Sequence, residues 1–312
     1  MITVFTPTYN RKNRLKNLYH SLLNQDYNDF EWLIIDDGST DGTKDYIEKL
    51  KSENKMNINY VYKENGGKMS AVNMAHDIAK GEAFITIDSD DELVPDILGT
   101  LHNDFTKISK NDSLAGIIYL AAYKNEPEII IGDKFPKDDI ICSYMDFKLK
   151  YKISGDKAAL WKTDVLRNYK YPIIDGEKFI PDIYLMMKIS EKKQVITKNK
   201  IVMLVEYLDN GYSNNYFNLV KKNPKGNVLY FKELYKYDKS FYNVYGYILF
   251  SLFAKVKFKN ILKEHRAKFK IILLYLPTYI IYLLRKWYYE KITDFWLYHG
   301  NGRSRKGFIW HS

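Results

Sequence analysis

Carboxylates gather in one short run of the chain, residues 88–92, directly after the apolar residues 83–87. The apolar residues are typical of a buried strand, and a carboxylate at the end of such a strand is stable only when it is paired or bound to a cation. Asp88 and Asp90 can both offer oxygen ligands to one divalent ion. Mg²⁺ typically takes one or two carboxylates and leaves its other positions to water and substrate phosphates. The run therefore indicates a metal that links the protein to a nucleotide diphosphate. Taken alone, these residues are explained equally well by an acidic turn before the next helix.

Alternating strands and helices are expected to position this run. Strand-like segments lie at 1–6, 31–36, 58–62, 83–88 and 115–119, and helix-like segments at 14–25, 43–52, 69–80 and 96–110. Leu15, Leu18 and Leu22 share one face of the first helix, as a helical period requires. Units of this size predict a mostly parallel sheet flanked by helices. Ligands of such sheets bind outside the carboxyl ends of the strands.

Each of the first four expected strands is followed by a polar, glycine-containing or acidic turn. The turns are residues 6–11, 36–42, 64–68 and 88–92. Each turn has an ordinary explanation by itself, because Asp-Gly and Asn-Gly are common turn pairs and Thr-Asp-Gly-Thr resembles a helix N-cap. Four such turns at successive strand ends are hard to attribute to turn chemistry alone. We therefore expect a ligand site at this edge of the sheet.

The segment 124–210 is less regular, and Asp182 is its most notable acidic residue. We expect Asp182 at the start of a helix whose Leu185, Met186 and Ile189 face inward. A carboxylate at a helix start is stabilised by the helix dipole. From the residues alone, a structural role is therefore the simpler interpretation of Asp182.

Composition bounds the class of protein. The chain has 312 residues, enough for one large domain with an extension or for two domains, and 46% of them are hydrophobic and 28% charged. Its one cysteine, Cys142, permits no intramolecular disulfide, which fits a reducing cytoplasm. Residues 1–5 are strand-like and do not resemble a secretory signal. These features predict a cytoplasmic protein.

Charge divides the chain unevenly. Residues 213–312 hold 19 Lys and Arg against 5 Asp and Glu, and also 25 of the 49 aromatic residues, whereas residues 1–212 hold 29 basic against 33 acidic residues. We place a domain boundary at this change, near residues 211–215. Basic charge interleaved with aromatic rings is typical of binding to nucleic acid or to an anionic membrane surface.

Residues 1–210 resemble the family 2 glycosyltransferases of the GT-A fold. The resemblance rests on four motifs in order, residues 7–10, 36–39, 65–68 and 88–91. It implies an α/β, Rossmann-like catalytic domain over residues 1–212 with a mostly parallel central sheet, followed by a helical C-terminal region over residues 213–312. The motifs are similar to those of the subgroup that builds bacterial capsule, exopolysaccharide or teichoic-acid polymers. The implied activity is inverting transfer of a hexose or N-acetylhexosamine from a UDP-sugar to a hydroxyl of a glycan or lipid-linked glycan.

The resemblance implies a pocket for the nucleotide base. Pro7 and Tyr9 would line it, since an aromatic face stacks on a planar base. Asp36 or Asp37 would accept a hydrogen bond from uracil N3–H, and Asn65 would help to hold the base.

The resemblance also implies a diphosphate and metal site around the acidic run. Asp88 would hold the ribose hydroxyls, Ser89 would lie beside it in the donor site, and Asp90 would bind Mn²⁺ or Mg²⁺ across the diphosphate, where the metal stabilises the leaving UDP. Many relatives carry an arginine seven residues after the position of Asn65, where this chain has Val72. Lys68 is expected to supply that positive charge, without the fork of an arginine.

Inverting transfer requires a general base that removes the acceptor proton. In related sequences this carboxylate opens a helix, often as the second residue of a Glu-Asp pair. The matching position is Asp182, although Pro181 stands where the first acidic residue is common. Glu177 is the rival base and Asp156 a weaker candidate.

Two apolar stretches, residues 241–254 and 271–284, stand out in the C-terminal region. The second has 14 uncharged residues, fewer than the roughly 20 that span a bilayer, and Pro277 lies in its middle. The basic and aromatic residues 285–289 follow it. This combination predicts peripheral contact of residues 241–290 with acidic lipid, at the inner face of the cell membrane. Core helices or a homo-oligomer surface are the alternatives, and nothing resembles a nucleic-acid-binding module.

Two other functions fit parts of the sequence. A nucleotidyltransferase that makes nucleotide sugars could use a related fold, but such enzymes usually carry an N-terminal Gly-rich phosphate loop, which residues 6–14 lack. A non-catalytic scaffold that binds nucleotide sugars is the other alternative. The carboxylates Asp88, Asp90 and Asp182 favour an enzyme.

Overall fold

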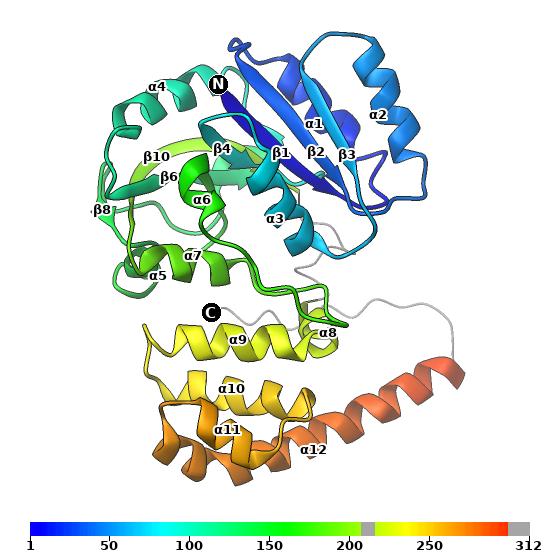
Figure 1. Cartoon of the computed structure of the whole chain (residues 1–312), viewed down its shortest axis with the longest axis vertical. Coiled ribbons are helices and arrows are strands. Elements are labelled where there is room, and N and C mark those ends of the chain that lie inside the picture. The colour runs from blue at the N-terminus through cyan, green and yellow to red at the C-terminus, as the bar shows by residue number, and fades with distance from the viewer. Residues whose placement is uncertain (207–215, 299–312) are drawn as a thin grey trace. The chain divides into compact units, whose positions relative to one another are not determined.

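The computed structural model describes residues 1–206 and 216–298, with side chains for 1–206 and 219–286. The chain divides into two compact units, the first formed by residues 1–173 and 185–207 and the second by residues 174–184 and 208–312. Figure 1 shows the elements of both units along the chain. The expected boundary at residues 211–215 lies outside the described residues.

One sheet organises the first unit. Its strands follow the spatial order β3-β2-β1-β4-β9-β6-β10-β5, with β7 paired to β6 and β8 to β10. The strands are β1 (Ile2–Thr8), β2 (Phe30–Asp36), β3 (Ile58–Tyr62), β4 (Ala83–Thr86), β5 (Glu92–Leu93), β6 (Leu114–Tyr123), β7 (Glu126–Ile130), β8 (Ile141–Cys142), β9 (Lys157–Lys162) and β10 (Gln194–Val205). Strands β3, β2, β1 and β4 are parallel neighbours. The α/β fold with a central sheet is therefore confirmed. The sheet is mixed and not mostly parallel as predicted, because five of the nine strand pairings among the described residues are antiparallel.

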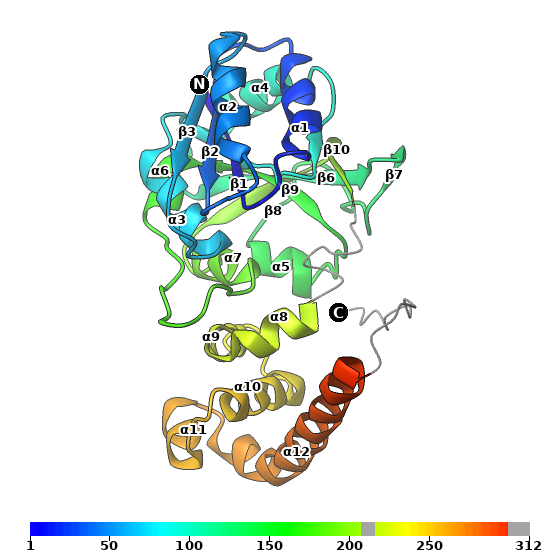
Figure 2. The same cartoon turned by 90° about the vertical axis from the view of Figure 1, so that its right-hand side faces the viewer.

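Helices cover both faces of this sheet. They are α1 (Leu15–Leu23), α2 (Thr43–Ser52), α3 (Lys68–Ile78), α4 (Leu98–Ile108), α5 (Tyr144–Leu149), α6 (Thr163–Arg167) and α7 (Ile183–Ser190). Figures 1 and 2 show α1, α2 and α4 on one face and α3 and α6 on the other. Leu15, Leu18 and Leu22 of α1 are buried with Trp32 and Leu101 in the main core, as the helical spacing predicts. The four expected helices of the first third are confirmed within two residues or fewer at each end.

The sequence analysis did not predict the antiparallel strand β9. This strand lies between β4 and β6 and runs opposite to both. Its pairing joins residues about 75 positions apart, so no local pattern could reveal it. The expected fourth strand is also shorter than predicted, because β4 ends at Thr86 and the acidic run begins in the turn beyond.

Apart from the segment 174–184, the described part of the second unit is mainly helical. They are α8 (Tyr216–Lys222), α9 (Pro224–Leu234), α10 (Phe241–Phe253), α11 (Phe258–Glu264) and α12 (Lys268–Tyr298). Val244, Tyr247 and Ile248 of α10 are buried in a cluster with Phe231 and Ile271. The apolar stretch 241–254 is therefore mainly core, although Phe241 and Tyr242 at its start are exposed. Membrane contact through residues 241–290 stays a prediction. In the described part of the chain, no helix is long and apolar enough to cross a membrane.

Candidate active site

The carboxyl ends of β1, β2, β3 and β4 meet at one edge of the sheet, as parallel pairing requires. The turns after these strands are joined to one another. The Asp37 amide donates to the Thr8 carbonyl, and the Asn10 amide donates to the Ser39 hydroxyl at 2.8 Å. Asn10 adopts a left-handed backbone conformation with φ 51°, which lets its side chain accept from the Thr40 amide. The first two predicted turns are therefore joined to one another.

Asp37 connects the second turn to the third. Its Oδ1 accepts from the Lys63 ammonium at 2.6 Å and from the Gly66 amide at 2.9 Å, and its Oδ2 accepts from the Gly67 amide at 2.7 Å. The Asn65 side chain donates to the Asp37 carbonyl. Gly67 has φ 88°, a backbone conformation that side chains with Cβ rarely adopt, which explains glycine at this turn. The structure thus brings Asp37 and Asn65 together, as a shared base pocket would require.

Asp36 is fully buried at the end of β2. Its Oδ1 accepts from the Ser39 amide and its Oδ2 from the Tyr60 hydroxyl, both at 2.8 Å. Burial, followed by the hydrogen bond to Asp36, raises the pKa of Tyr60 above its usual range. Both acidic residues of this turn are buried and held by several hydrogen bonds.

Tyr9 and Pro7 lie on the first turn and its strand. Pro7 is partly buried within β1, and the Tyr9 side chain beyond the strand end is 50% exposed. An exposed ring at this edge offers a face on which a flat ligand can stack.

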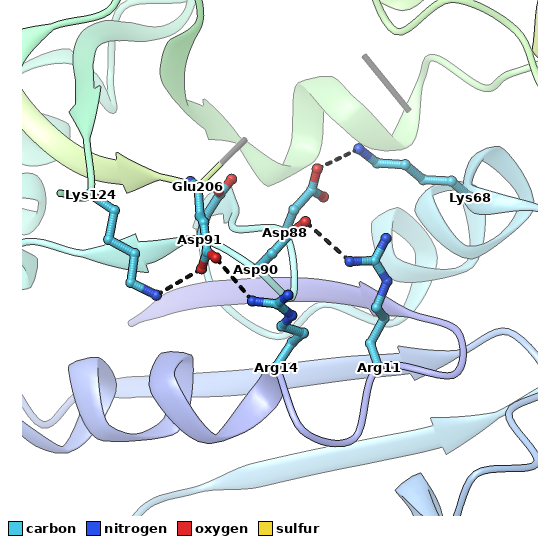
Figure 3. A network of polar contacts seen from close by, with 8 residues as sticks. All are labelled: Arg11, Arg14, Lys68, Asp88, Asp90, Asp91, Lys124 and Glu206. Carbon is cyan, nitrogen blue, oxygen red and sulfur yellow. Dashed lines mark hydrogen bonds and ion pairs between the residues drawn. The ribbon is translucent and has the colours of Figure 1, made fainter. Parts of the chain in front are cut away.

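The acidic run follows β4, and basic side chains lie around it (Figure 3). Lys68, the first residue of α3, places its ammonium 2.8 Å from Oδ2 of Asp88, and Arg11 places Nη1 3.3 Å from Oδ2 of Asp90. The amide of Asp91 donates to the Asp88 carbonyl, which closes a tight turn around the buried Ser89. The residues predicted for a diphosphate and metal site are therefore close together.

The buried carboxylates of the acidic run repel one another. Burial raises the pKa of Asp90, and the nearby Asp88 charge adds to the effect despite Arg11. Burial, followed by the charges of Asp88 and Asp90, raises the pKa of Asp91 to about 8. A bound cation would relieve this repulsion between carboxylates.

A divalent cation fits the donor atoms present. Oδ1 of Asp88 is buried and has no hydrogen-bond partner among the described residues, and Asp90 retains 21% exposure. Carboxylate oxygens are the hard ligands that Mg²⁺ and Mn²⁺ prefer. In the described part of the chain, no three or more His, Cys, Asp or Glu side chains are grouped around one point. Asp88 and Asp90 are the carboxylates of this run that could hold such an ion.

A second ion-pair network, not predicted from the sequence, lies beside the acidic run (Figure 3). Glu206, after β10, accepts from Arg14 at 3.0 Å and from Lys124 at 3.2 Å, and Lys124 also pairs with Glu92 at 2.7 Å. The Glu206 amide donates to Oδ1 of Asp91. Burial alone would raise the pKa of Glu206, but Lys124 and Arg14 hold it below the usual value.

Arg11 could have been noticed, because it stands in the first strand-end turn, and Arg14 lies directly before α1. Glu206 and Lys124 are 82 residues apart and belong to no motif. Val72, at the expected arginine position, is buried on α3. The guanidinium beside the acidic run instead belongs to Arg11, in the turn after β1.

The base candidates lie in different parts of the structure. Asp182 is exposed directly before α7, and Glu177 belongs with it to the segment 174–184 of the second unit. The inward residues of α7 are Leu185, Met187 and Ile189, so the predicted inward position of Met186 is wrong by one residue.

Glu177 has a structural partner, the first turn of α9. Its two carboxylate oxygens accept from the amides of Lys225 and Gly226, each at 2.8 Å. A carboxylate in this position caps the helix and favours its dipole. The structure therefore gives Glu177 a stabilising role.

Asp156 lies in the first unit, directly before β9. Antiparallel pairing sets Ala83 opposite Lys162 and Ile85 opposite Leu160, so the start of β9 lies toward the carboxyl end of β4. Asp156 is exposed there, at the edge that carries the acidic run.

Residues 3–135 match the family model described as glycosyl transferase family 2. The chain contains a family 2 glycosyltransferase domain. The chain is 31% identical over 178 residues to the GalNAc(5)-diNAcBac-PP-undecaprenol beta-1,3-glucosyltransferase of Campylobacter jejuni. The matched region covers 54% of this chain and 54% of that relative. The chain is 35% identical over 99 residues to the putative teichuronic acid biosynthesis glycosyltransferase TuaG of Bacillus subtilis, covering 31% of this chain and 39% of that one. The chain thus spans about half, or less, of these relatives.

Solved structures share the fold of this family 2 domain. S. aureus TarS residues 1–349, crystallised with UDP, superposes with a TM-score of 0.54 at 20% identity, covering 86% of this chain and 76% of that one. A second TarS structure contains UDP-GlcNAc. The mannosyltransferase PcManGT of Pyrobaculum calidifontis, in complex with GDP-Man and Mn²⁺, gives a TM-score of 0.54 at 18% identity, covering 92% and 82%. The GT-A fold expected from the sequence is confirmed.

Proposed function

We propose that this chain is an inverting, metal-dependent glycosyltransferase that moves a sugar from a UDP-sugar to an acceptor hydroxyl in bacterial surface-polysaccharide synthesis. The observation that carries the proposal is the arrangement of Asp88 and Asp90 with Lys68 and Arg11 at the edge where four strand ends meet. The family 2 domain supports glycosyl transfer, and the TarS complexes with UDP and UDP-GlcNAc support a UDP-sugar donor.

The base would bind between the first three turns. Tyr9 would stack on uracil beside Pro7, and Asp36 or Asp37 would accept from N3–H with a lone pair that their protein partners leave available. Asn65, fixed on the Asp37 carbonyl, would orient the base. These groups are rigid, so little conformational entropy would be lost on binding.

The diphosphate would lie against the acidic run. Asp88 would hold the ribose hydroxyls, with Ser89 in the turn beside it, and Asp90 would hold the metal with help from Oδ1 of Asp88. When bound, Mn²⁺ or Mg²⁺ would stabilise the charge that develops on the leaving UDP. Lys68 and Arg11 would turn toward the phosphates as the metal takes over their carboxylates, because an ammonium and a guanidinium both pair well with phosphate. The Mn²⁺ in PcManGT supports this assignment.

Asp182 would remove the acceptor proton as the hydroxyl attacks the sugar from the face opposite UDP. An exposed carboxylate at a helix start is accessible to an acceptor hydroxyl, as a general base must be. Glu177 caps the first turn of α9, which gives the carboxylate of this rival a structural role.

The acceptor would be a glycan or lipid-linked glycan. The C. jejuni relative is named for an undecaprenol-diphosphate-linked acceptor, and TuaG for teichuronic acid biosynthesis. The undecaprenol in the first name supports a lipid-linked acceptor. Synthesis would take place at the inner face of the cell membrane.

Release of UDP from a panel of UDP-sugars, with Mn²⁺ and lipid-linked acceptors, tests the proposal. We expect one UDP-sugar to yield UDP only when acceptor is present, and Asp90→Asn to abolish that release. Asp45→Asn, on the exposed surface of α2, is the matched control. Release of pyrophosphate from a nucleoside triphosphate would indicate a nucleotidyltransferase. Donor binding without release under any acceptor would indicate a scaffold.

A further inference from the structure

Helix α12 is uncharged and mainly apolar on every side between Ile271 and Leu284. No charged residue occurs from 271 to 284. One face packs into the core of the second unit, where Ile271 and Thr278 are buried. Rings fix this contact, with Tyr275 against Phe258 of α11 at 4.4 Å between centroids. A helix that is apolar all round is normally covered all round.

The opposite face of α12 is exposed. Its large apolar side chains recur at spacings of three and four residues, which places them on one side of the helix. They are Phe269 (77% exposed), Ile272 (61%), Leu273 (55%), Leu276 (66%), Ile280 (51%), Leu283 (46%) and Leu284 (61%). The stripe is about 23 Å long at 1.5 Å per residue. No other described residue covers these side chains, and soluble monomers rarely expose apolar patches beyond a few hundred Å².

We propose that this stripe of α12 lies in the surface of an anionic lipid bilayer, with the helix axis parallel to the membrane. Cations mark both ends of the stripe, Lys268 and Lys270 before it and Arg285 and Lys286 after it. The ammonium of Lys270 lies over the Phe241 ring, 4.7 Å from its centroid, which holds this cation at the end of the apolar stripe. Apolar side chains flanked by cations are the arrangement that inserts between acyl chains while pairing with acidic headgroups.

The charges favour a membrane over a second copy of the chain. A symmetric antiparallel dimer along α12 would set the cations at one end of the stripe against the cations at the other end, and residues 213–312 carry 19 basic against 5 acidic residues. An acidic bilayer would instead attract every one of these cations. The stripe is also too short to span a bilayer, because its 14 uncharged residues fall below the roughly 20 that are needed. The helix therefore lies on the membrane.

Flotation of the full chain with lipid vesicles tests this inference, which does not depend on the proposed donor or reaction. The vesicles are phosphatidylcholine with and without phosphatidylglycerol. We expect the chain to float with the anionic vesicles, to float less as NaCl rises, and to stay unbound with neutral ones. Leu276→Glu, at a 66% exposed position, should lower the fraction bound more than about tenfold without unfolding the second unit.

Ile129→Glu is the matched control, since it adds the same charge at an exposed apolar residue of β7 in the first unit. Circular dichroism and UDP affinity should be unchanged in both variants. Equal flotation of wild type and Leu276→Glu would overturn the inference, as would absence of salt-sensitive flotation by the wild type. A dimer in sedimentation that Leu276→Glu converts to monomers, without any vesicle binding, would identify the stripe as a contact between copies instead.

Discussion

The ammonium of Lys68 lies 2.8 Å from Oδ2 of Asp88, which joins the first turn of α3 to the acidic run after β4. Arg11 makes the matching contact with Asp90 from the turn after β1. Two cations thus face two carboxylates whose charges oppose one another, and burial raises the pKa of Asp90 further. In the proposed function, these cations and carboxylates would exchange partners with a diphosphate and a metal.

Metal and nucleotide binding should be coupled through Asp90. We expect Asp90→Asn to weaken UDP binding in Mn²⁺ roughly tenfold or more, because the cation that holds the diphosphate loses an anionic ligand. EDTA should weaken wild-type binding to a similar degree and leave the variant nearly unchanged. Titration calorimetry measures both, with Asp45→Asn as control. Equal UDP affinity with and without metal would remove the metal from the site.

Lys68 and Arg11 should contribute to diphosphate affinity and not to folding. Lys68→Met and Arg11→Gln should each weaken UDP binding by roughly tenfold, the usual value of a charge-assisted hydrogen bond. Uridine binding should be unaffected, since it carries no phosphate. Lys16→Gln, an exposed position on α1, is the matched control. Equal loss of UDP and uridine affinity would mean that these cations only support the loop.

Uracil should be the preferred base. Competition of UDP, GDP and CDP against a labelled donor should rank UDP first, because the acceptor atoms of Asp36 and Asp37 match N3–H of uracil. Tyr9→Ala should weaken all three nucleotides through loss of stacking, by roughly tenfold. Tighter competition by GDP would contradict the assignment of the base pocket.

Asp182 should be the catalytic base. Asp182→Asn keeps the size of the side chain but cannot take a proton, so we expect transfer to fall about 10²–10⁴-fold with donor affinity retained. Asp156→Asn should remain active in the same assay.

Glu177→Gln separates catalysis from helix capping. It should lower the stability of the second unit by about 1 kcal/mol through weaker capping of α9, with transfer retained. An inactive Glu177→Gln or Asp156→Asn beside an active Asp182→Asn would show that the base was assigned to the wrong carboxylate.

The second unit should lose stability in acid through His265. Burial, with the charge of Lys232, lowers the pKa of His265 to about 4, and its Nδ1 accepts from the Ala267 amide. The folded state therefore disfavours the proton that the unfolded state binds below about pH 6.5. Stability is full above that pH and falls as pH drops toward 4, by about 3 kcal/mol in total.

Hydrogen exchange of the α10 and α11 amides at pH 7 and pH 5 measures this loss. His265→Asn keeps an acceptor without a titrating group and should flatten the pH dependence. His20→Asn, at an exposed position of α1, is the control. The same pH dependence in His265→Asn would assign it to another group.

The sequence by itself determined the elements of the first third and the edge at which they present polar residues. Apolar spacing predicted α1, and the turns after the strands contained Asp37, Asn65, Asp88 and Asp90. These features are local, because the period of a helix or strand and the turn chemistry at its end depend on neighbouring residues. Parallel pairing then required the strand ends to meet.

Only the tertiary structure decided which distant residues complete the site. Lys124 follows β6 and Glu206 follows β10, and no local pattern predicts that these two strands pair. Strand β9 likewise runs antiparallel to both of its neighbours. The same holds for Glu177, which is a plausible base by sequence and a helix cap by contact.

The two apolar stretches of the second unit show the same division. Residues 241–254 and 271–284 are alike in length and composition, yet α10 is buried and α12 leaves one face exposed. The hydropathy of a helix indicates how strongly its burial is favoured. Which of its faces is buried depends on the other helices that pack against it. Within the predicted range of residues 241–290, the packing of the helices therefore limits the proposed membrane contact to one face of α12.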